Sequence, residues 1–533
     1  MGYKEISLNL PTDYTAEELR EKIGKNLKRD SSCSYQSSKG LSLCASDNQN
    51  DSGAEDFSYQ INKKSLDARK KNDVHWQIRA LVTSKTIKGP SYVPQPPLNI
   101  PYQKRNKKIV VVGSGPAGFF SAFVLQKAGF DTTIIERGAD VIKRAEGIKA
   151  FEKTGDFNSV CNYAFGEGGA GTFSDGKLTS RTKRIALEKE FILSSYVEAG
   201  ANEEIKYLAH PHLGSDNLIR IVKNLREKYQ DIGGKVLFET SLDDLVVKNG
   251  RVVEAVTNKG VISADEFLIA PGHSAHDTYR MLIRNGVKFR TKNFAIGCRV
   301  EHPQEVINKA QWGCESLPGV KAAEYRLTSK GNGNLPVYTF CMCPGGIIVN
   351  ASAYNDINIV NGMSLYNRAG KFANAACVAG VNLDNLMQSE LSPLQALDWL
   401  ESLERKFNSY SGFKAPYCSV LDFINKKVPN KPVESSYSLG LTPAPLWELL
   451  SAEISCAIRA GLKDFSNKIK DFDTGNIMGL ETKTSSPIQV IREKNGLCTG
   501  FENLYIIGEG SGYSGGIISS AVDGIKAAIN IIN

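Results

Sequence analysis

The sequence lacks several features that would assign it to a special class of protein. Its apolar stretches, such as residues 109–112 and 504–507, have the length of a strand, far below the roughly 20 residues that cross a bilayer. Proline accounts for only 20 of the 533 residues and 41% of the chain is apolar, which excludes disorder for most of it. The opening residues MGYKEISLNL have no basic segment followed by an apolar one, so neither a secretory signal nor a membrane partner is expected.

Cysteine and charge point to no special partner either. The 11 cysteines are scattered between Cys33 and Cys498 without regular spacing, which argues against a disulfide framework and favours a reduced, cytoplasmic protein. Lys and Arg outnumber Asp and Glu by 65 to 57, an excess that permits nucleic-acid binding without predicting it. His210 and His212 have no clear third ligand nearby, so no metal site is expected. No pattern indicates an oligomeric state.

The first 100 residues are predicted to form a small N-terminal α/β domain of the ferredoxin-like type. A helix is expected to begin near Thr15, and hydrophobic alternation predicts strands at residues 3–10, 57–61 and 74–82. The Ser-rich residues 31–56 are expected to be a flexible insertion. Five prolines within residues 89–101 favour an extended linker, which makes this the main domain boundary.

Glycine, with 48 residues, is slightly more frequent than usual and concentrates in three clusters after this linker. The first cluster follows an apolar strand at residues 107–112 and opens a helix that runs to about Lys127. It consists of Gly113, Ser114, Gly115, Pro116, Ala117 and Gly118. A second strand ends in Glu136, 18 residues beyond Gly118, which completes a dinucleotide fingerprint. Pyrophosphate is expected at the helix N-terminus and the adenosine ribose at Glu136, with Arg137 beside it.

The second cluster, residues 165–178, fits the same glycine spacing but is not a second fingerprint. Residues 158–164 are too polar for a central strand, and Ser174, Asp175 and Gly176 would break any helix. An extended loop whose free amides lie along a flat ring and its diphosphate is the preferred interpretation, and a flexible surface loop is the alternative. The candidate contacts in this loop are Thr172, Asp175, Gly176 and Lys177.

The third cluster and one further strand end complete the predicted site. An apolar strand leads into Gly508, Glu509 and Gly510, and the last helix opens at Gly515, Gly516 and Ile517. Glu509 is placed to bind a polyol, and the positive end of that helix could stabilise an anion formed on a ring carbonyl. Another buried strand ends in Ala270, Pro271, Gly272 and His273. A predicted hairpin with its turn at Asn249 and Gly250 precedes this strand. Ligands of doubly wound sheets bind at such carboxyl ends.

Taken in order, these motifs resemble the flavin-dependent oxidoreductases of the glutathione-reductase-like superfamily. FGEGGAGTFSDGKLTSR, FCMCPGGIIVNAS, NGMS, ETKTSSP and GEGSGYSGGI resemble, more narrowly, the bacterial family of uncharacterised FAD-dependent dehydrogenases, also labelled NAD(FAD)-utilising dehydrogenases. The resemblance runs from about Lys107 to Asn533. It implies non-covalent FAD and an α/β fold: a discontinuous Rossmann-type FAD domain at residues 101–285 and 481–533, with an inserted mixed α+β substrate domain at 286–480. The wider superfamily has Gly-Asp where this chain has Gly508 and Glu509.

Catalytic side chains stay unassigned, because a flavin carries the hydride chemistry itself. The candidates are Lys177, His273, Cys341 and Cys343. Lys177 either raises the electron affinity of the flavin or is a solvated loop lysine, and His273 either contacts FAD phosphates or meets the substrate. Cys341 and Cys343 are either redox-active or buried structural thiols, since C-x-C spacing strains a direct bridge.

The expected function is an FAD-dependent oxidoreductase that transfers hydride between the flavin and an organic substrate bound by residues 286–480. No second complete fingerprint is present, so NADH or NADPH, if used as reductant, would visit the substrate pocket transiently. The alternatives are an RNA-associated flavoprotein, suggested by the basic residues 104–108, and a flavin redox sensor without turnover. The substrate, the electron donor and acceptor and the direction of transfer are not specified by these motifs.

Overall fold

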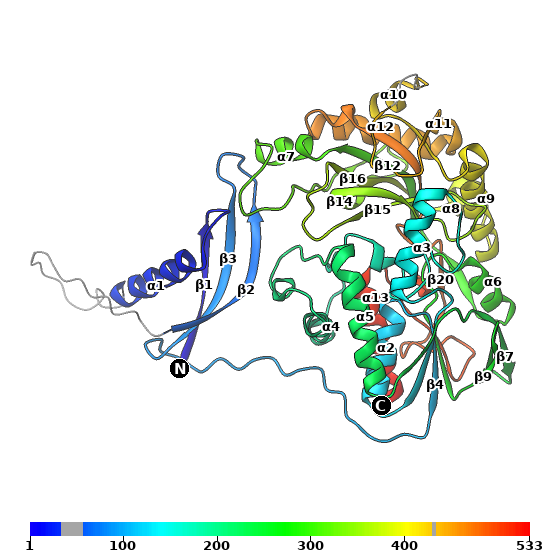
Figure 1. Cartoon of the computed structure of the whole chain (residues 1–533), viewed down its shortest axis with the longest axis horizontal. Coiled ribbons are helices and arrows are strands. Elements are labelled where there is room, and N and C mark those ends of the chain that lie inside the picture. The colour runs from blue at the N-terminus through cyan, green and yellow to red at the C-terminus, as the bar shows by residue number, and fades with distance from the viewer. Residues whose placement is uncertain (34–56, 429–432) are drawn as a thin grey trace, which may run out of the picture.

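The computed structural model describes residues 1–33, 57–428 and 433–533. Figure 1 shows three regions: a small N-terminal unit, a body built on a parallel sheet, and a larger, mostly antiparallel sheet covered by helices. The expected insertion at residues 31–56 lies outside the described residues except for its first three, which end helix α1. No helix in the described ranges is both long enough and apolar enough to span a membrane.

The N-terminal unit is a three-stranded antiparallel sheet covered by one helix. Its strand order is β1-β3-β2, and its apolar core is formed by residues such as Ile6, Leu8, Ile23 and Ile78. Its elements are β1 Gly2–Leu10, α1 Ala16–Cys33, β2 Phe57–Asp67 and β3 His75–Ser84. The expected ferredoxin-like fold is therefore only half right: the strand order fits, but the described residues hold no second helix or fourth strand. After Ser84 the chain enters its proline-rich segment, which cannot continue a regular ladder.

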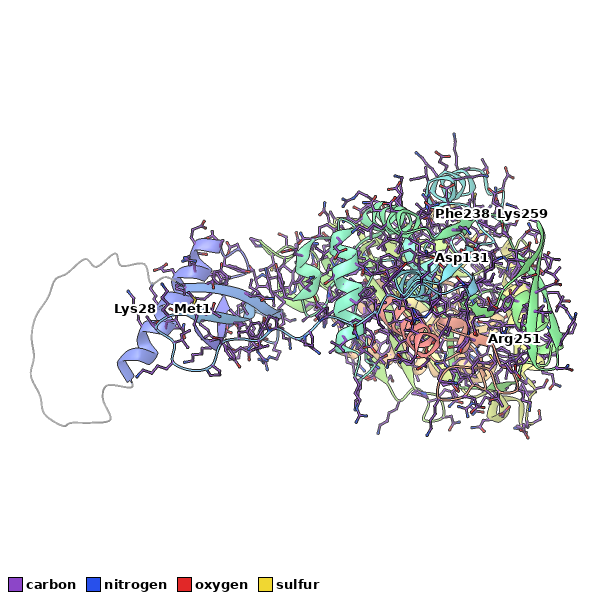
Figure 2. The ribbon with its side chains drawn as sticks, turned by 90° about the horizontal axis from the view of Figure 1, so that it is seen from below. Met1, Lys28, Asp131, Phe238, Arg251 and Lys259 are labelled. Atoms are coloured by element: carbon purple, nitrogen blue, oxygen red, sulfur yellow. The ribbon has the colours of Figure 1, made fainter. Side chains whose placement is uncertain are left out.

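The proline-rich segment runs from the N-terminal unit to the body (Figure 1) and forms no helix or strand. No described helix or strand lies between β3 and the next strand at Lys108, and Leu98 and Ile100 pack partly buried against the core of the parallel sheet. Figure 2 shows Met1 and Lys28 at the opposite end of the molecule from Arg251 and Lys259. Lys64 connects the unit to the body through backbone hydrogen bonds with Tyr207 and Ala209 of 2.8 and 2.9 Å.

The parallel sheet has strand order β21-β10-β4-β5-β6. Its strands are β4 Lys108–Val112, β5 Asp131–Ile135, β6 Lys235–Leu237, β10 Glu266–Ile269 and β21 Leu504–Ile506. Alternate side chains of β4 face different layers: Ile109 and Val111 pack with helices on one side, Val110 and Val112 with a small antiparallel sheet on the other. The helices are α2 Pro116–Lys127, α4 Ala186–Glu198, α5 Ser215–Asp231 and α13 Ile517–Ile532. Both faces are thus buried, as a parallel sheet requires.

The second layer confirms the predicted hairpin. It consists of β7 Leu242–Lys248, β8 Arg251–Thr257 and β9 Gly260–Ser263. Asn249 and Gly250 both have positive φ, +49° and +77°, the geometry of a type I′ turn. The remaining elements of the body are α3 Val141–Thr154, η1 Ala170–Phe173, η2 Glu203–Lys206, α6 His276–Arg284, β11 Phe289–Thr291, β20 Ile488–Val490 and η4 Glu509–Ser511. Residues 158–164 form no strand, as predicted.

The third region is an eight-stranded sheet of order β13-β14-β16-β12-β19-β17-β18, with β15 paired to β14. Its strands are β12 Phe294–Pro303, β13 Thr328–Ser329, β14 Val337–Asn350, β15 Val360–Ser364, β16 Phe372–Val381, β17 Ala415–Ser419, β18 Leu441–Pro443 and β19 Asn476–Glu481. Its helices are α7 Gln304–Trp312, α8 Leu383–Met387, α9 Pro393–Ser411, α10 Val420–Asn425, α11 Leu446–Leu449, α12 Ala452–Lys468 and η3 Phe472–Thr474.

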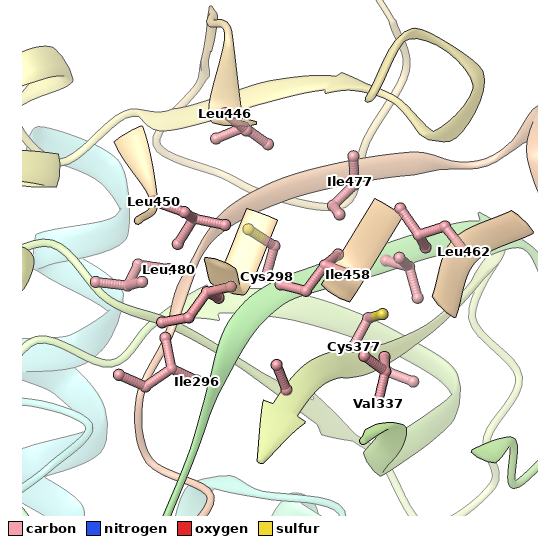
Figure 3. Packing of buried hydrophobic residues seen from close by; sticks show 14 of the residues in the cluster. Ile296, Cys298, Val337, Cys377, Leu446, Leu450, Ile458, Leu462, Ile477 and Leu480 are labelled. Atoms are coloured by element: carbon pink, nitrogen blue, oxygen red, sulfur yellow. The ribbon is translucent and has the colours of Figure 1, made fainter. Parts of the chain in front are cut away.

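One apolar core joins this sheet to its helices. In Figure 3, Cys298 of β12 and Cys377 of β16 lie among Ile458 and Leu462 of α12. Helix α9 begins with a capping box between Ser392 and Gln395 and with Pro393 at its first position. The pairing of β14 with β16 is irregular between Phe340 and Cys343, so β14 has a bulge at Cys341 and Met342.

Candidate functional site

Four of the predicted segments meet at the carboxyl ends of neighbouring parallel strands. The backbone nitrogens of Gly113, Ala270 and Ile507 bond to the strand next to each of them, at 2.8, 2.7 and 2.9 Å. We call this row the carboxyl edge: residues 113–118, 136–137, 270–273 and 508–510. The strand order therefore brings together motifs that lie almost 400 residues apart, as the sequence predicted.

The glycines of the first turn have different roles. A Cβ atom on Gly118 would overlap the carbonyl oxygen of Gly113, and one on Gly113 would overlap that of Ala270. A Cβ on Gly115 would have its nearest protein neighbour, the Cα of Gly169, at 3.7 Å, an ordinary contact. Packing within the protein thus explains Gly113 and Gly118, whereas it would accept a Cβ atom at Gly115. Close approach of a ligand is the remaining physical reason for a glycine there.

Two helices begin at this edge without a side-chain cap. Neither Gly115, before α2, nor Gly516, before α13, provides a capping hydrogen bond, so their first N–H groups stay available. A Cβ on Gly515 would meet nothing within 4 Å. Helix α3 is different, because Asp140 accepts from Ile142 and Lys143. Open N-termini of this kind suit phosphate oxygens or a partly anionic carbonyl.

Glu136 lies where the fingerprint predicts it, but its carboxylate already has protein partners. One oxygen accepts from the backbone nitrogen and hydroxyl of Ser114, at 2.9 and 2.7 Å. The other accepts from the nitrogens of Gly138 and Gly166, at 2.9 and 3.1 Å. Glu136 is therefore the buried clamp that holds the first turn against the second glycine segment. Arg137, also a predicted contact, forms a bidentate pair with Asp277 instead.

The second glycine segment is held by Arg144, a residue that the sequence interpretation missed. Its fully buried guanidinium donates to five backbone oxygens, those of Asn162, Tyr163, Gly166, Glu167 and Gly169, at 2.8–3.3 Å. Burial lowers the pKa of Arg144 to about 10, while the nearby carboxylates of Glu136 and Glu167 oppose this. The loop is thus tightly fixed, which contradicts the alternative of a flexible surface loop. Thr172 is buried there, and its hydroxyl donates to the oxygen of Glu167 at 3.3 Å.

Asp175 and Lys177 connect this loop to the antiparallel sheet. Asp175 accepts a bidentate pair from Arg368, at 3.0 and 2.6 Å, and lies 3.0 Å from the Lys177 ammonium. Lys177 also donates to the Met342 oxygen of β14. Burial would lower the pKa of Lys177, but the charges of Asp175 and Cys343 raise it above its usual value. Lys177 is therefore a paired, mostly buried cation, and the alternative of a solvated loop lysine is wrong. The nitrogen of Gly176 bonds to the Ser174 hydroxyl at 3.0 Å.

His273 and Glu509 lie at neighbouring strand ends. Neither ring nitrogen of the buried His273 has a hydrogen-bond partner of ordinary geometry, and burial together with the Lys483 charge holds the pKa of this histidine well below the usual value. Burial raises the pKa of Glu509 to about 7, although the charges of Lys483 and Lys292 oppose this. The His273 imidazole is therefore neutral, with the Ser485 backbone as its one weak partner, and the buried Glu509 carboxyl group is readily protonated. Close to them, a Cβ on Gly510 would overlap the Pro271 ring, and the Gly272 oxygen accepts from Tyr279 at 2.6 Å.

A pocket joins the three glycine segments. Its lining includes Ser114 and Pro116 of the first, Gly168 and Thr172 of the second, and Ile517 of the last helix. Apolar residues of α5 and Phe238, labelled in Figure 2, form its outer wall. The pocket is small, about 40 Å³, so it suits one part of a longer ligand, and the uncapped helix N-termini beside it suit a phosphate group of that ligand.

Comparisons with known proteins agree with this geometry. Residues 107–297 match the family profile "Pyridine nucleotide-disulphide oxidoreductase", and residues 293–484 match "FAD-dependent protein, C-terminal domain-like". A protein of Clostridium beijerinckii (strain ATCC 51743 / NCIMB 8052), described as uncharacterised, is 39% identical over 493 residues, which cover 89% of this chain and 92% of that protein.

Similar solved structures are more distant. The crystal structure of CtdE in complex with FAD and substrate 4 has a TM-score of 0.36 and 10% identity, covering 80% of each chain. That of glycine oxidase from Bacillus cereus ATCC 14579 has a TM-score of 0.32 and 10% identity, covering 80% of this chain and 95% of the other.

Proposed function

Because the chain belongs to the family of FAD-dependent oxidoreductases with this C-terminal domain, we propose that it binds FAD non-covalently along the carboxyl edge and the adjoining glycine loop. The observation that carries the proposal is the convergence of three glycine segments on one pocket. The open space at Gly515, the absence of a clash at Gly115 and the two uncapped helices support it.

Each part of the edge has a proposed task. The amides of Gly115, Ala117 and Gly118 bind the pyrophosphate at the start of α2, and those of Gly516 and Ile517 face the flavin ring carbonyl at the start of α13. Glu509 bonds to the ribityl chain. Glu136 bonds to the adenosine ribose by giving up part of its hydrogen bonding to Ser114. FAD supplies the hydride chemistry, and these residues supply orientation and exclusion of water.

The domain assignment is a proposal as well. Residues 101–285 and 481–533 form the FAD domain, 286–480 the substrate domain and 1–100 a separate N-terminal domain, in a cytoplasmic protein. Contacts such as Asp175 to Arg368 and His276 to Glu401 connect the two larger parts. Hydride passes between FAD and an organic substrate held between them, and NADH or NADPH reaches the same pocket as a transient reductant.

Anaerobic addition of NADH, NADPH and a panel of organic donors to the FAD-loaded protein tests this function. Bleaching of the flavin absorbance by at least one donor is expected, with recovery on addition of an acceptor. Acid precipitation should leave the yellow colour in the supernatant. A flavin that no donor reduces would contradict turnover, and colour in the pellet would contradict non-covalent binding.

A further inference from the structure

The C-x-C pair, Cys341 and Cys343, lies at the bulge of β14. Cys341 has φ of +44°, in the left-handed region that residues other than glycine seldom adopt. In a regular strand, residues two apart have Cα atoms about 6.7 Å apart, the upper limit for a disulfide. The irregular backbone departs from that spacing: the Cys343 thiol donates to the Cys341 carbonyl oxygen at 3.3 Å, and it lies close enough to the Cys341 sulfur to change the pKa of that thiol. The two sulfur atoms are therefore already neighbours.

Two cations hold this pair: Arg299, which is fully buried, and Lys177, which is mostly buried. The Arg299 guanidinium donates to the Cys341 oxygen at 2.6 Å and lies 3.6 Å from the Cys343 sulfur. It is fixed by Glu481 at 2.8 Å and by Asn374 at 2.7 Å. Lys177 approaches from the glycine loop through its bond to the Met342 oxygen. The charges of Arg299 and Lys177 both stabilise a thiolate rather than a thiol.

The two thiols have opposite acidities. The hydrogen bond from Cys343 lowers the pKa of Cys341 to about 5, and Lys177 and Arg299 add to this against burial and Asp175. The same bond, with burial, raises the pKa of Cys343 well above its usual value. The neighbouring carboxyl groups of Glu481 and Glu509 have pKa values near 7 because they are buried, so they add little opposing charge below that pH. At neutral pH the pair is one thiolate and one thiol.

The two sulfur atoms differ in solvent exposure, and this difference indicates which of them attacks first. Cys341 is partly exposed, whereas Cys343 is buried behind it. Burial alone raises the pKa of other cysteines, such as Cys377 and Cys498, to about 12, so those thiols are inert. A reactive thiolate in front of a buried resolving thiol is the arrangement of a thiol–disulfide exchange site. Strain in a C-x-C bridge would make that bridge easy to reduce again.

We propose that Cys341 and Cys343 form a dithiol centre that reduces a low-molecular-weight disulfide. The Cys341 thiolate attacks one sulfur of R–S–S–R, and the first RS⁻ leaves. The Cys343 sulfur then attacks the Cys341 sulfur, the second RS⁻ leaves, and the Cys343 proton passes to a released thiolate. The two cysteines are oxidised to a disulfide, and R–S–S–R is reduced to two thiols. Solvent supplies the second proton, which replaces the one that Cys341 lost when it ionised. This activity goes beyond the proposed hydride transfer and is measured without it, so either can fail alone.

The test treats the full-length, FAD-loaded protein with glutathione disulfide and maps the peptide that carries residues 341–343 by mass spectrometry. A Cys456→Ser background removes an exposed cysteine of α12 and should behave as wild type. The expected wild-type product is an internal disulfide at this peptide with release of two glutathione molecules per pair. Cys343→Ser should stop at a mixed disulfide on Cys341, and Cys341→Ser should not react at this peptide.

A wild-type peptide that stays a dithiol, or stops at the mixed disulfide, overturns the proposal, and this result needs no variant to fold. A second measurement follows iodoacetamide alkylation of Cys341 at pH 8 and pH 6. With a pKa of about 5 the rate should fall less than about twofold, whereas a thiol of pKa about 8.5 would slow by about 80-fold. Lys177→Met should enlarge the fall. A wild-type fall close to 80-fold overturns the thiolate assignment.

Discussion

The carboxyl edge and the C-x-C bulge are built in opposite ways. At the edge, backbone amides and missing side chains form the site, and each segment is contiguous in sequence. At the bulge, side chains from four distant segments, around Lys177, Arg299, Cys341 and Glu481, create the local charge. A site made of backbone leaves a recognisable local motif, whereas a site made of converging charges leaves only isolated residues.

Breaking the charge network should give the largest effect on stability. Arg299→Met leaves Glu481 buried without its cation, and removal of one partner of a buried pair typically costs about 3–5 kcal/mol. Burial already raises the pKa of Glu481 to about 7, so protonation should soften the loss below that pH. Denaturant unfolding of the FAD-free variant at pH 6 and pH 8 measures both effects. The double variant with Glu481→Gln should recover part of the stability, and a loss below about 1 kcal/mol at pH 8 would contradict this account.

Two alanine variants separate the roles of the glycines at the edge. Gly118→Ala should destabilise the FAD-free protein by about 1–3 kcal/mol or more, because its Cβ overlaps the Gly113 oxygen. Gly115→Ala should leave that stability within about 0.5 kcal/mol, since its Cβ makes only an ordinary contact. Its FAD affinity should nevertheless fall at least about tenfold. FAD affinity is measured by titration of flavin fluorescence. An affinity of Gly115→Ala equal to that of the wild type would show that the pyrophosphate does not bind at this turn.

Glu136 tests whether one carboxylate serves both the protein and the ligand. Glu136→Gln keeps the size of the side chain but replaces a charged acceptor, whose hydrogen bonds contribute about 1.5–3 kcal/mol each, by a neutral amide. FAD binding should weaken about tenfold to a hundredfold. If thermal stability of the FAD-free protein falls while FAD affinity is unchanged, Glu136 acts only as the clamp between Ser114 and Gly166.

The smallest expected effect is a pH dependence at Glu509. Its folded pKa of about 7 lies above the usual value of 4.5, so the folded state holds a proton that the unfolded state has lost. Stability contributed by this proton is complete below about pH 4.5 and is lost as the pH rises toward 7. Glu509→Gln should therefore leave the Tm of the FAD-free protein unchanged at pH 4.5 and raise it by up to about 2 °C at pH 8. An equal shift at both pH values would contradict the assignment.

Local patterns predicted the strands, the glycine turns and the helices beside the edge, because each depends on neighbours in sequence. Arg144 could have been found, since it shares the spacing of the buried face of α3 with Val141, Ile148 and Phe151. Arg299 and Arg368 could not, because their partners lie in distant segments and no period marks them. The ferredoxin-like fold expected for the N-terminal unit was only half right for a related reason. The strand order β1-β3-β2 is shared with that fold, but the described residues contain neither its second helix nor its fourth strand.

The central claim, that three separate glycine segments hold one FAD, is tested most directly by hydrogen exchange of the FAD-free and FAD-loaded protein. FAD should slow amide exchange in residues 113–118, 166–176 and 508–517 together, and should leave the hairpin at residues 242–257 unchanged. Protection confined to one of the three segments, or found only outside them, would contradict the account.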